Sequence, residues 1–548
     1  MTDSRGPRRR AFQAVAVAKG GYMYKRIRVA LLVVVALVAA ACGDDDDGGG
    51  AAGGDGDTTE TTEQAADFDP DGVLRYGVPL DGSGVSGRLA PFASTSVCDV
   101  MVMAPIYDTL IHNDPRTGEL SPGLAESWEV VDERTVELTL REGATFHDGS
   151  PFDAEAVKAG LERNAAEDAA QTATSLAIFD AIEVVDDQTV RINLNAPAGG
   201  SVPAILSGRE GMIVAPSAIE TADTEPVGAG PFRLAEHQPG QRITLERYDD
   251  YWNADEVRLG GVELVNSESG PPTTNALLAG EIDMAMVSPD VLGGLEGDPN
   301  IEIAEQPGSA YHKLNWNLSE PPFDNLQVRQ AINHAIDREA VLQAVFGGMG
   351  SVAWGPYPER FYGYNPDVEG VYDYDPEEAE RLLAESGVED PSFTAFVPPT
   401  PQFIRFGEVL QQQLGDVGID MELVQSTDIV QDYFTDKGQP ATVILWPPRP
   451  DPVDTLRIQF TPDTFNNVGN YSNDDLNSLV EQIRATADQD ERQPLFEEGS
   501  QIVVDEALDL PVAYAPLLHA ARANVGGEVV QNENCQGVDF TKLQINVE

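Results

Sequence analysis

The sequence predicts an α/β protein with two lobes, preceded by a long acidic segment near the N-terminus. The chain has 548 residues, more than a single hydrophobic core usually supports. Strand-like alternation and helix-like periodicity both occur in each half of the body, so we expect two lobes, each with its own sheet. The content of 51 glycines and 38 prolines is typical of a loop-rich globular protein.

Residues 1–41 have the pattern of an export signal. A basic stretch, residues 25–28, precedes thirteen apolar residues, Val29 to Ala41, whereas a membrane-spanning helix needs about 20. The apolar run ends in three alanines followed by Cys42 and a glycine, which resembles the lipobox of bacterial lipoproteins. We therefore expect Cys42 to be acylated and to become the mature N-terminus. Cleavage without lipidation is the alternative.

The segment after Cys42 is predicted to be a tether. Residues 43–68 are mostly Gly, Asp and Thr, with little to bury, so residues 42–72 are expected to form a disordered acidic link. The run Asp44 to Asp47 is interpreted as solvated charge rather than a metal site. The formal net charge of −58 repels nucleic-acid phosphates and anionic lipid headgroups, so no nucleic-acid partner is predicted.

Two similar alternating segments, residues 130–140 and 184–194, predict hairpins in the first half of the body. In the first, Val136, Leu138 and Leu140 should face the core, and the matching positions of the second should do the same. A helix beginning after the cap Asp153 separates them. Two copies are too few for a solenoid, so the hairpins are assigned to one α/β lobe.

The second half also contains amphipathic helices. Eight apolar residues lie on one helical face between Val328 and Val345, with Gly347 as the stop. Asp375 and Pro376 begin a second helix, which Gly387 ends.

Six segments in order resemble the extracellular solute-binding proteins of family 5, the dipeptide, oligopeptide and nickel-binding group. They are YDTLIHNDPRTGELSPGLAESWEV (107–130), LREGATFHDGSPFDAEAVKAGLER (140–163), GAGPFRLAEHQPG (228–240), RYDDYWN (247–253), PPFDNLQVRQAINHAIDREAV (321–341) and YDPEEAERLLAESG (374–387). The resemblance implies a periplasmic-binding-protein-like fold of class II, in the large cluster with an extra subdomain. Two crossing segments and a ligand cleft belong to that fold.

The same resemblance gives the expected domain boundaries. Lobe 1, with the extra subdomain, takes residues 73–310, lobe 2 takes 311–518, and residues 519–548 return to lobe 1. The crossings are expected near 311–317 and His519.

Candidate ligand contacts also follow from the resemblance. In peptide-binding members an acid just after a tryptophan holds the peptide ammonium, and the matching stretch here runs from Trp446 to Asp454. The Asp-Pro pair remains as Asp451 and Pro452, but Pro448 or Arg449 replaces the acid. A cation at Arg449 would attract a carboxylate or phosphate. The alternative is a solvated surface arginine.

Five residues are weaker candidates for the cleft. Trp446 and Trp316 offer flat apolar walls, although core packing explains either equally well. Asn317 in the expected crossing strand, and Thr95 and Ser96 in the first lobe, offer polar groups. The six histidines lack metal-ligand spacing, so neither a metal site nor a cofactor is predicted. With Cys42 acylated, Cys98 and Cys535 remain as a candidate disulfide. A buried free thiol at Cys98 is the alternative.

The sequence thus predicts the substrate-binding lipoprotein of an ABC importer, a monomer on the outer face of the cytoplasmic membrane or in the periplasm. It should bind a peptide or peptide-like solute and meet a permease with separate ATPase subunits, since the chain has no phosphate-binding GxxxxGK loop. A binding or sensing protein without transport is the alternative. An exported hydrolase is a distant third, because no GxSxG or HExxH motif occurs.

Overall fold

The computed structural model describes residues 67–80, 85–94, 96–169, 171–268, 270–532 and 537–547. The chain divides into two compact units, residues 1–64 and 65–548, and every described residue belongs to the second. The expected signal segment, Cys42, Thr95 and Cys535 lie outside the described residues.

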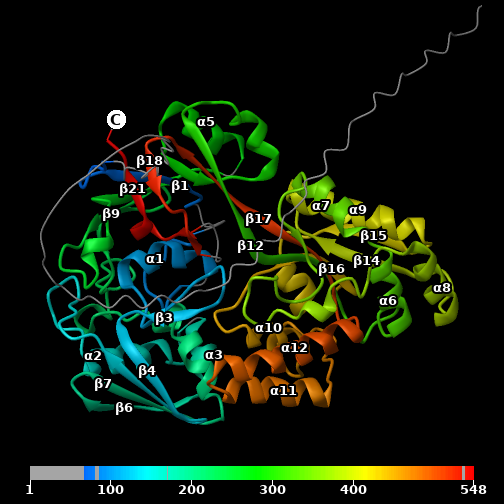
Figure 1. Ribbon diagram of the computed structural model, residues 1–548, viewed down its shortest axis with the longest axis horizontal. Helices are drawn as coiled ribbons and strands as arrows, with labels where there is room; N and C mark the ends of the chain where they lie inside the picture. The colour runs from blue at the N-terminus through cyan, green and yellow to red at the C-terminus, as the bar shows by residue number, and fades with distance from the viewer. Residues whose placement is uncertain are drawn as a thin grey trace, which may run out of the picture. The chain divides into compact units, whose positions relative to one another are not determined.

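One mixed sheet of eleven strands organises the second unit (Figure 1). The strand order is β15-β14-β16-β12-β17-β11-β1-β10-β9-β8, and β13 pairs with β17. The strands are β1 (Val73–Val78), β8 (Phe232–Gln238), β9 (Arg242–Arg247), β10 (Gly261–Asn266), β11 (Met284–Met286), β12 (Ile301–Trp316), β13 (Ser351–Val352), β14 (Ser392–Val397), β15 (Asp420–Gln425), β16 (Ala441–Trp446) and β17 (Leu510–Arg522). The prediction of a separate sheet for each lobe is wrong, because β12 and β17 are long enough to take part in both halves.

The two long strands β12 and β17 are the crossing segments. They run antiparallel, and their register breaks between Pro307 and Tyr311. Before the break they lie beside β11, and after it beside β16. At Gly308 an added Cβ would lie 2.1 Å from the carbonyl oxygen of Ala515, so this close approach requires glycine. The boundaries 310/311 and 518/519 remain predictions.

Lobe 1 packs the β1 side of the sheet against α1 (Val100–Tyr107) and the C-terminal segment. β18 (Val525–Gly527) pairs with β21 (Leu543–Ile545), and β19 (Gln531–Asn532) with β20 (Gly537–Val538). The ring of Tyr76 meets that of Phe540 edge-on, with centroids 5.7 Å apart, and its hydroxyl is 3.0 Å from His519 Nε2. Residues after 519 therefore share the core of the first strand.

A second sheet of four strands, in the order β4-β5-β7-β6, forms a separate layer with α2 (Ala154–Asn164) and α3 (Thr172–Leu176) (Figure 1). Its strands are β4 (Ala125–Asp132), β5 (Thr135–Leu140), β6 (Phe179–Asp186) and β7 (Thr189–Leu194). The two predicted hairpins are confirmed, and the predicted inward residues Val136, Leu138 and Leu140 are buried. Asp153 caps α2 as predicted, since its carboxylate accepts from the Ala156 backbone nitrogen.

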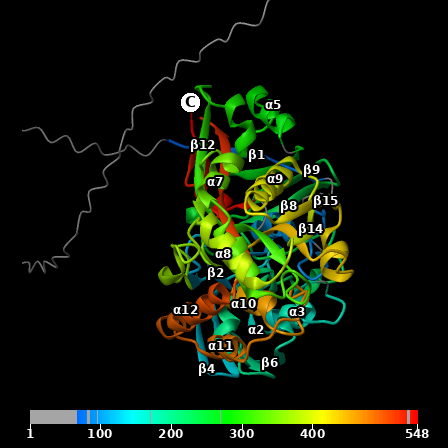
Figure 2. The same ribbon diagram turned by 90° about the vertical axis from the view of Figure 1, so that its right-hand side faces the viewer.

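Lobe 2 surrounds the β16 side of the sheet with helices. They are α6 (Leu326–His334), α7 (Arg338–Phe346), α8 (Pro376–Ser386), α9 (Pro401–Asp416), α10 (Val453–Phe460), α11 (Asp474–Ala485) and α12 (Gln489–Asp505). Helices α11 and α12 lie side by side in both views (Figures 1 and 2). The predicted start of α8 at Asp375 and its stop at Gly387, with φ of +72°, are confirmed.

The single helix predicted from Val328 to Val345 is two helices. α6 ends at His334 and α7 begins at Arg338, because the Asp337 side chain caps α7 by accepting from the Ala340 backbone nitrogen. All eight predicted apolar residues are nevertheless buried. Asp337 is a residue type that often caps helices, and its place within the apolar pattern could have indicated this break.

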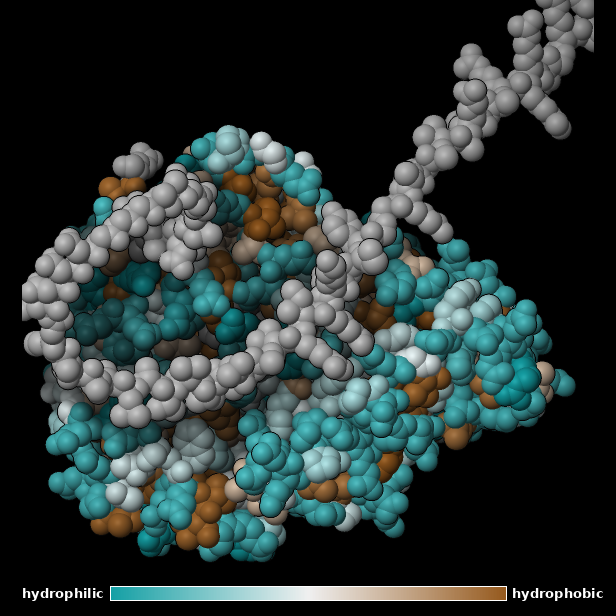
Figure 3. All heavy atoms as spheres, in the orientation of Figure 1, coloured by the Kyte–Doolittle hydropathy of each residue, from teal (hydrophilic) through white to brown (hydrophobic). Residues whose placement is uncertain are grey.

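Other short elements complete the described chain: β2 (Ile111–Asn113), β3 (Leu120–Pro122), α4 (Val202–Ile205) and α5 (Pro271–Ala279). The face drawn in Figure 3 is mostly hydrophilic, with smaller apolar areas between polar ones. Within the described ranges, no helix has both the length and the apolar character needed to cross a bilayer.

The cysteines give a testable prediction. Cys98 is disulfide-bonded, and Cys535 lies outside the described residues, so their pairing stays a prediction. Thiol titration of the denatured, unreduced Cys42→Ala chain should find no free thiol. Two reactive thiols would contradict the bridge.

Candidate ligand-binding cleft

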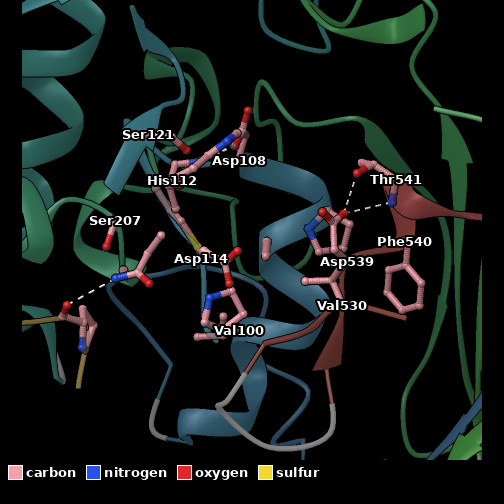
Figure 4. A pocket seen from close by; sticks show the side chains of 18 of the residues that line it. Val100, Asp108, His112, Asp114, Ser121, Ser207, Val530, Asp539, Phe540 and Thr541 are labelled. Atoms are coloured by element: carbon pink, nitrogen blue, oxygen red, sulfur yellow. Dashed lines mark hydrogen bonds and ion pairs between the residues drawn. The ribbon is translucent and has the colours of Figure 1, made fainter. Parts of the chain in front are cut away.

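A cavity of about 650 Å³ lies between residues of the first lobe and a smaller wall from the second. The first lobe contributes α1, the β2–β3 hairpin, residues 207–212 and the C-terminal segment around Asp539 (Figure 4). The second contributes Phe361 and residues 448–450. This volume is in the range of sites that enclose a small molecule, about 300 to 1,000 Å³.

Direct contacts join the two walls beside the cavity. Asn113 Nδ2 donates to the carbonyl oxygen of Pro450 at 3.3 Å, and an added Cβ at Gly208 would lie 3.2 Å from Pro450 Cγ. Arg360 Nε donates to the carbonyl oxygen of Arg116 at 2.9 Å, beside the β2–β3 turn. Residues 207–210 therefore face residues 448–450 at close range.

Asp108 and His112 form a pair at the end of α1. The Asp108 carboxylate is 2.6 Å from His112 Nε2 and accepts from Tyr251 Oη at 2.8 Å and from Trp252 Nε1 at 3.0 Å. Burial alone would raise the pKa of Asp108, but the charge and hydrogen bond of His112 lower it. Burial alone would lower the pKa of His112, but the charge and hydrogen bond of Asp108, together with the charge of Asp539, raise it overall. The pair therefore gives the cavity a polar wall whose side chains are held in place by hydrogen bonds.

Most other charges in the cavity are neutralised by neighbours. Arg116 pairs with Asp114 at 2.7 Å and with Glu528 at 2.8 Å. Lys542 pairs with Glu256 at 2.8 Å. These contacts leave little uncompensated charge on the β2–β3 turn and at the base of the C-terminal segment.

Two arginines of the cavity make no ion pair with any described residue. Arg209 donates to Gln171 Oε1 at 3.0 Å and to the carbonyl oxygen of Ser96 at 2.6 Å. Arg449 has its guanidinium carbon 4.9 Å from the ring centre of Trp446, and its Nε is buried without a hydrogen-bond partner. Burial lowers the pKa of both arginines. Each remains a cation, because even a lowered arginine pKa lies above neutral pH.

Glu210 is a carboxyl group that acts electrostatically on both arginines, although Asp454 acts more strongly on Arg449. It lies in the cavity wall beside Arg209 and interacts electrostatically with both Arg209 and Arg449. Burial raises the pKa of Glu210, and Arg209 and a hydrogen bond from Ser175 only partly oppose this shift.

The structure distributes the predicted site residues unevenly. Arg449 lines the cavity, whereas Trp446 packs behind it with Tyr311 and Tyr514. Asp451 is 1% exposed and pairs with Arg492, with oxygen–nitrogen distances of 2.8 and 3.0 Å.

The remaining candidates lie away from the cavity. Trp316 stacks on Phe323 in the core of lobe 2, and Asn317 accepts hydrogen bonds from the backbone and hydroxyl of Ser319. Ser96 does not line the cavity, but its carbonyl holds Arg209. Both tryptophans pack against neighbouring side chains, and their contact with a ligand stays a prediction.

Sequence reasoning missed Arg209, Glu210 and the Asp108–His112 pair. The pair lies within one of the recognised motifs, where most residues were interpreted as packing. Arg209 and Glu210 carry no motif, and only the fold brings residue 209 opposite residue 449. Among the described residues, no group of three or more His, Cys, Asp or Glu is placed to hold a metal ion.

Two lobes joined by a pair of crossing strands, with a polar cavity between them, define a two-lobed solute-binding protein. The comparisons identify the family. The model of the bacterial extracellular solute-binding proteins, family 5, middle region, matches residues 119–467, so the chain belongs to this family. It is a solute-binding protein of the ABC-transporter type and not an enzyme.

Named relatives cover most of the chain. The dipeptide-binding protein of Escherichia coli K12 is 28% identical over 469 residues, which are 78% of this chain and 86% of the relative. Heme-binding protein A of Haemophilus influenzae is 28% identical over 452 residues, 75% of this chain and 82% of the relative. The crystal structure of an ABC transporter substrate-binding protein from Listeria monocytogenes has the same fold, with a TM-score of 0.76, 23% identity and coverage of 87% of this chain and 99% of that one.

Proposed function

We propose that this chain is the exported, lipid-anchored receptor of an ABC importer that captures a peptide or peptide-like solute and delivers it to the permease. The observation that carries the proposal is the cavity of about 650 Å³ between the two lobes, with the unpaired Arg449 in its wall. Relatives named for dipeptides, for di- and tripeptides and for glutathione support a peptide-like solute. The partners are then permease and ATPase subunits, and the receptor itself is a monomer.

Delivery requires that the bound and free forms differ. A solute that touches both walls stabilises the closed form by its differential affinity for that form. The permease then distinguishes an occupied receptor from an empty one by closure. The direct test of the function is mass spectrometry of the solute that co-purifies with the native protein, and a preparation that never carries or binds a small solute would contradict it.

The ligand contacts remain part of this proposal. Arg449 is the residue that we expect to meet the solute, with Trp446 supporting its guanidinium from behind. Asp451, Trp316, Asn317, Thr95 and Ser96 would act through the surrounding structure rather than by contact. The pairing of Cys98 with Cys535 would fix the C-terminal segment, which includes Asp539, to lobe 1.

Arg449→Glu should reverse the charge preference of the cleft. We expect it to weaken the binding of peptides with a free carboxylate by about 1.5 to 3 kcal/mol, the value of a charged hydrogen bond, and to weaken peptide amides far less. Isothermal titration with matched acids and amides measures this difference. Arg381→Glu on the exposed face of α8 is the control, and an unchanged acid preference in Arg449→Glu would place Arg449 outside the binding site.

Cys42→Ala should release the protein from the membrane. Acyl chains on Cys42 would supply the anchor, so the variant should move to the soluble extracytoplasmic fraction. Fractionation followed by immunoblotting measures the change, with the wild type as reference. A variant that stays with the membrane would contradict lipidation at Cys42.

A further inference from the structure

Two arginines that make no ion pair with the described residues line the cleft, one from each lobe. Arg116 and Lys542 are paired with carboxylates, but Arg209 and Arg449 make no ion pair with any residue in the described ranges. Arg209 belongs to the first lobe and Arg449 to the second. Their segments face each other, because Pro450 lies against Gly208 and its carbonyl oxygen accepts from Asn113.

We propose that Arg209 and Arg449 together bind one anionic group of the solute, a carboxylate or a phosphate, from opposite sides of the cleft. This inference rests on the proposed function. It adds a second residue, from the other lobe, to the contact expected for Arg449.

Both guanidinium groups are held in place by contacts that leave their charge unsatisfied. Gln171 and the Ser96 carbonyl position Arg209, and the Trp446 ring supports Arg449. The buried Nε of Arg449 has no hydrogen-bond partner within the part of the chain that the structure describes. A planar guanidinium offers paired donors that match the oxygens of carboxylates and phosphates, so an anion would supply the missing partners.

The position of the two residues links anion binding to closure. An anion that contacts only one arginine gains one charged interaction, whereas an anion between both gains two. Only an arrangement that brings the lobes together offers both, so the anionic group favours the closed form. A neutral analogue of the same shape would lose this preference.

Glu210 lies beside the same pair and should oppose anion binding. Glu210 lines the same cavity, and its carboxylate interacts electrostatically with both arginines. Asp454 and Arg457 from α10 also contribute to the field at these residues. Removing the Glu210 charge should therefore strengthen the binding of an anion and leave a neutral analogue unaffected.

The experiment compares matched anionic and neutral probes. The protein is stripped of endogenous solute by unfolding without reductant and refolding. It is then titrated with a pool of tripeptides bearing free carboxylates, with the same tripeptides as amides, and with inorganic phosphate. We expect the wild type to bind the acids, or phosphate, at least about tenfold more tightly than the amides, a ratio that corresponds to about 1.4 kcal/mol.

Variants then assign the preference to residues. Arg209→Gln and Arg449→Gln should each bring the acid-to-amide ratio close to one, Arg209→Lys should keep part of it, and Glu210→Gln should raise it. Arg381→Gln on α8 is the control for loss of one positive charge and should leave the ratio unchanged. Because Arg209 also holds the Ser96 and Gln171 segments together, thermal unfolding of each variant checks the fold.

The outcomes separate the inference from the function on which it rests. A ratio that survives Arg209→Gln overturns the shared site. Equal binding of acids and amides by the wild type overturns it too, while the proposed function stands. Binding of phosphate alone supports the shared site and identifies the anion as phosphate. Failure of every probe to bind contradicts the proposed peptide-like solute and the shared site together.

Discussion

Asp451→Ala is expected to lower the free energy of unfolding by about 3 to 5 kcal/mol, because it leaves Arg492 buried without its counter-charge. The side chains of Asp451 and Arg492 are 1% and 5% exposed, and the carboxylate oxygens lie 2.8 and 3.0 Å from Arg492 Nη2. Asp451 also accepts from the backbone nitrogen of Val453 at the start of α10. Denaturant unfolding of the wild type and the variant measures the loss. The comparison requires that the free energy of unfolding fall with denaturant concentration at the same slope in both proteins.

Asp454→Ala is the matched control for this prediction. Asp454 pairs with Arg457 one turn along α10, and both side chains are partly exposed, so its loss should cost about 0.5 kcal/mol or less. If Asp451→Ala instead keeps its stability and loses solute binding, Asp451 acts on the ligand and the structural interpretation is wrong.

Lys313→Met is expected to lower the free energy of unfolding by about 3 to 5 kcal/mol, the usual cost of removing one partner of a buried ion pair. Lys313 lies in β12 with a fully buried side chain, and its ammonium is 2.9 Å from Asp509 Oδ2 and also contacts Gln459. Burial lowers the pKa of Lys313, although the neighbouring Asp509 opposes this shift. Methionine fills a similar volume, so the expected loss comes from the Asp509 carboxylate, which stays buried without a cation and, among the described residues, keeps only the hydrogen bond from Tyr311 Oη at 3.3 Å.

The double variant Lys313→Met/Asp509→Leu tests this explanation. Replacing both charges with apolar side chains removes the unpaired carboxylate, so most of the lost stability should return. Equilibrium unfolding of the wild type, both single variants and the double variant gives the coupling energy. A double variant no more stable than Lys313→Met would show that an unpaired Asp509 carboxylate is not the cause of the loss.

Local structure could be predicted from the sequence because caps, stops and alternating patterns depend on residues close together in the chain. The caps Asp153 and Asp375, the stop Gly387 and the alternation around Val136 each act within a few residues, and the structure confirms them. The break between α6 and α7 was missed because the apolar spacing continues through it. The shared sheet was missed because strand pairing between β12 and β17 joins residues about 200 positions apart, which no local pattern shows.

The candidate site was less readable for a related reason. Arg449 could be singled out because it stands where the family pattern has an acid, and it lines the cavity. Tryptophan and aspartate are residue types that often bind ligands. In the folded chain, however, Trp316 stacks on Phe323 and Asp451 pairs with the buried Arg492. Arg209 and Glu210 acquire their significance only from the opposite wall, so their roles depend on the packing of two distant segments.

The pairing of β12 with β17 is irregular between Pro307 and Tyr311, and again between His312 and Lys313. Paired strands on either side resist bending, so deformation concentrates in the short stretch that lacks regular pairing. Arg360 donates to the Pro307 carbonyl at 2.5 Å and to Ser309 Oγ at 2.9 Å, and also reaches Arg116 at the rim of the cavity. If the receptor closes on its solute as proposed, the stiffness of this stretch would contribute to the free energy that closure requires, and that cost would be subtracted from the intrinsic affinity of every solute. Two receptors with identical cleft side chains would therefore differ in affinity if their backbones differed at residues 308–310.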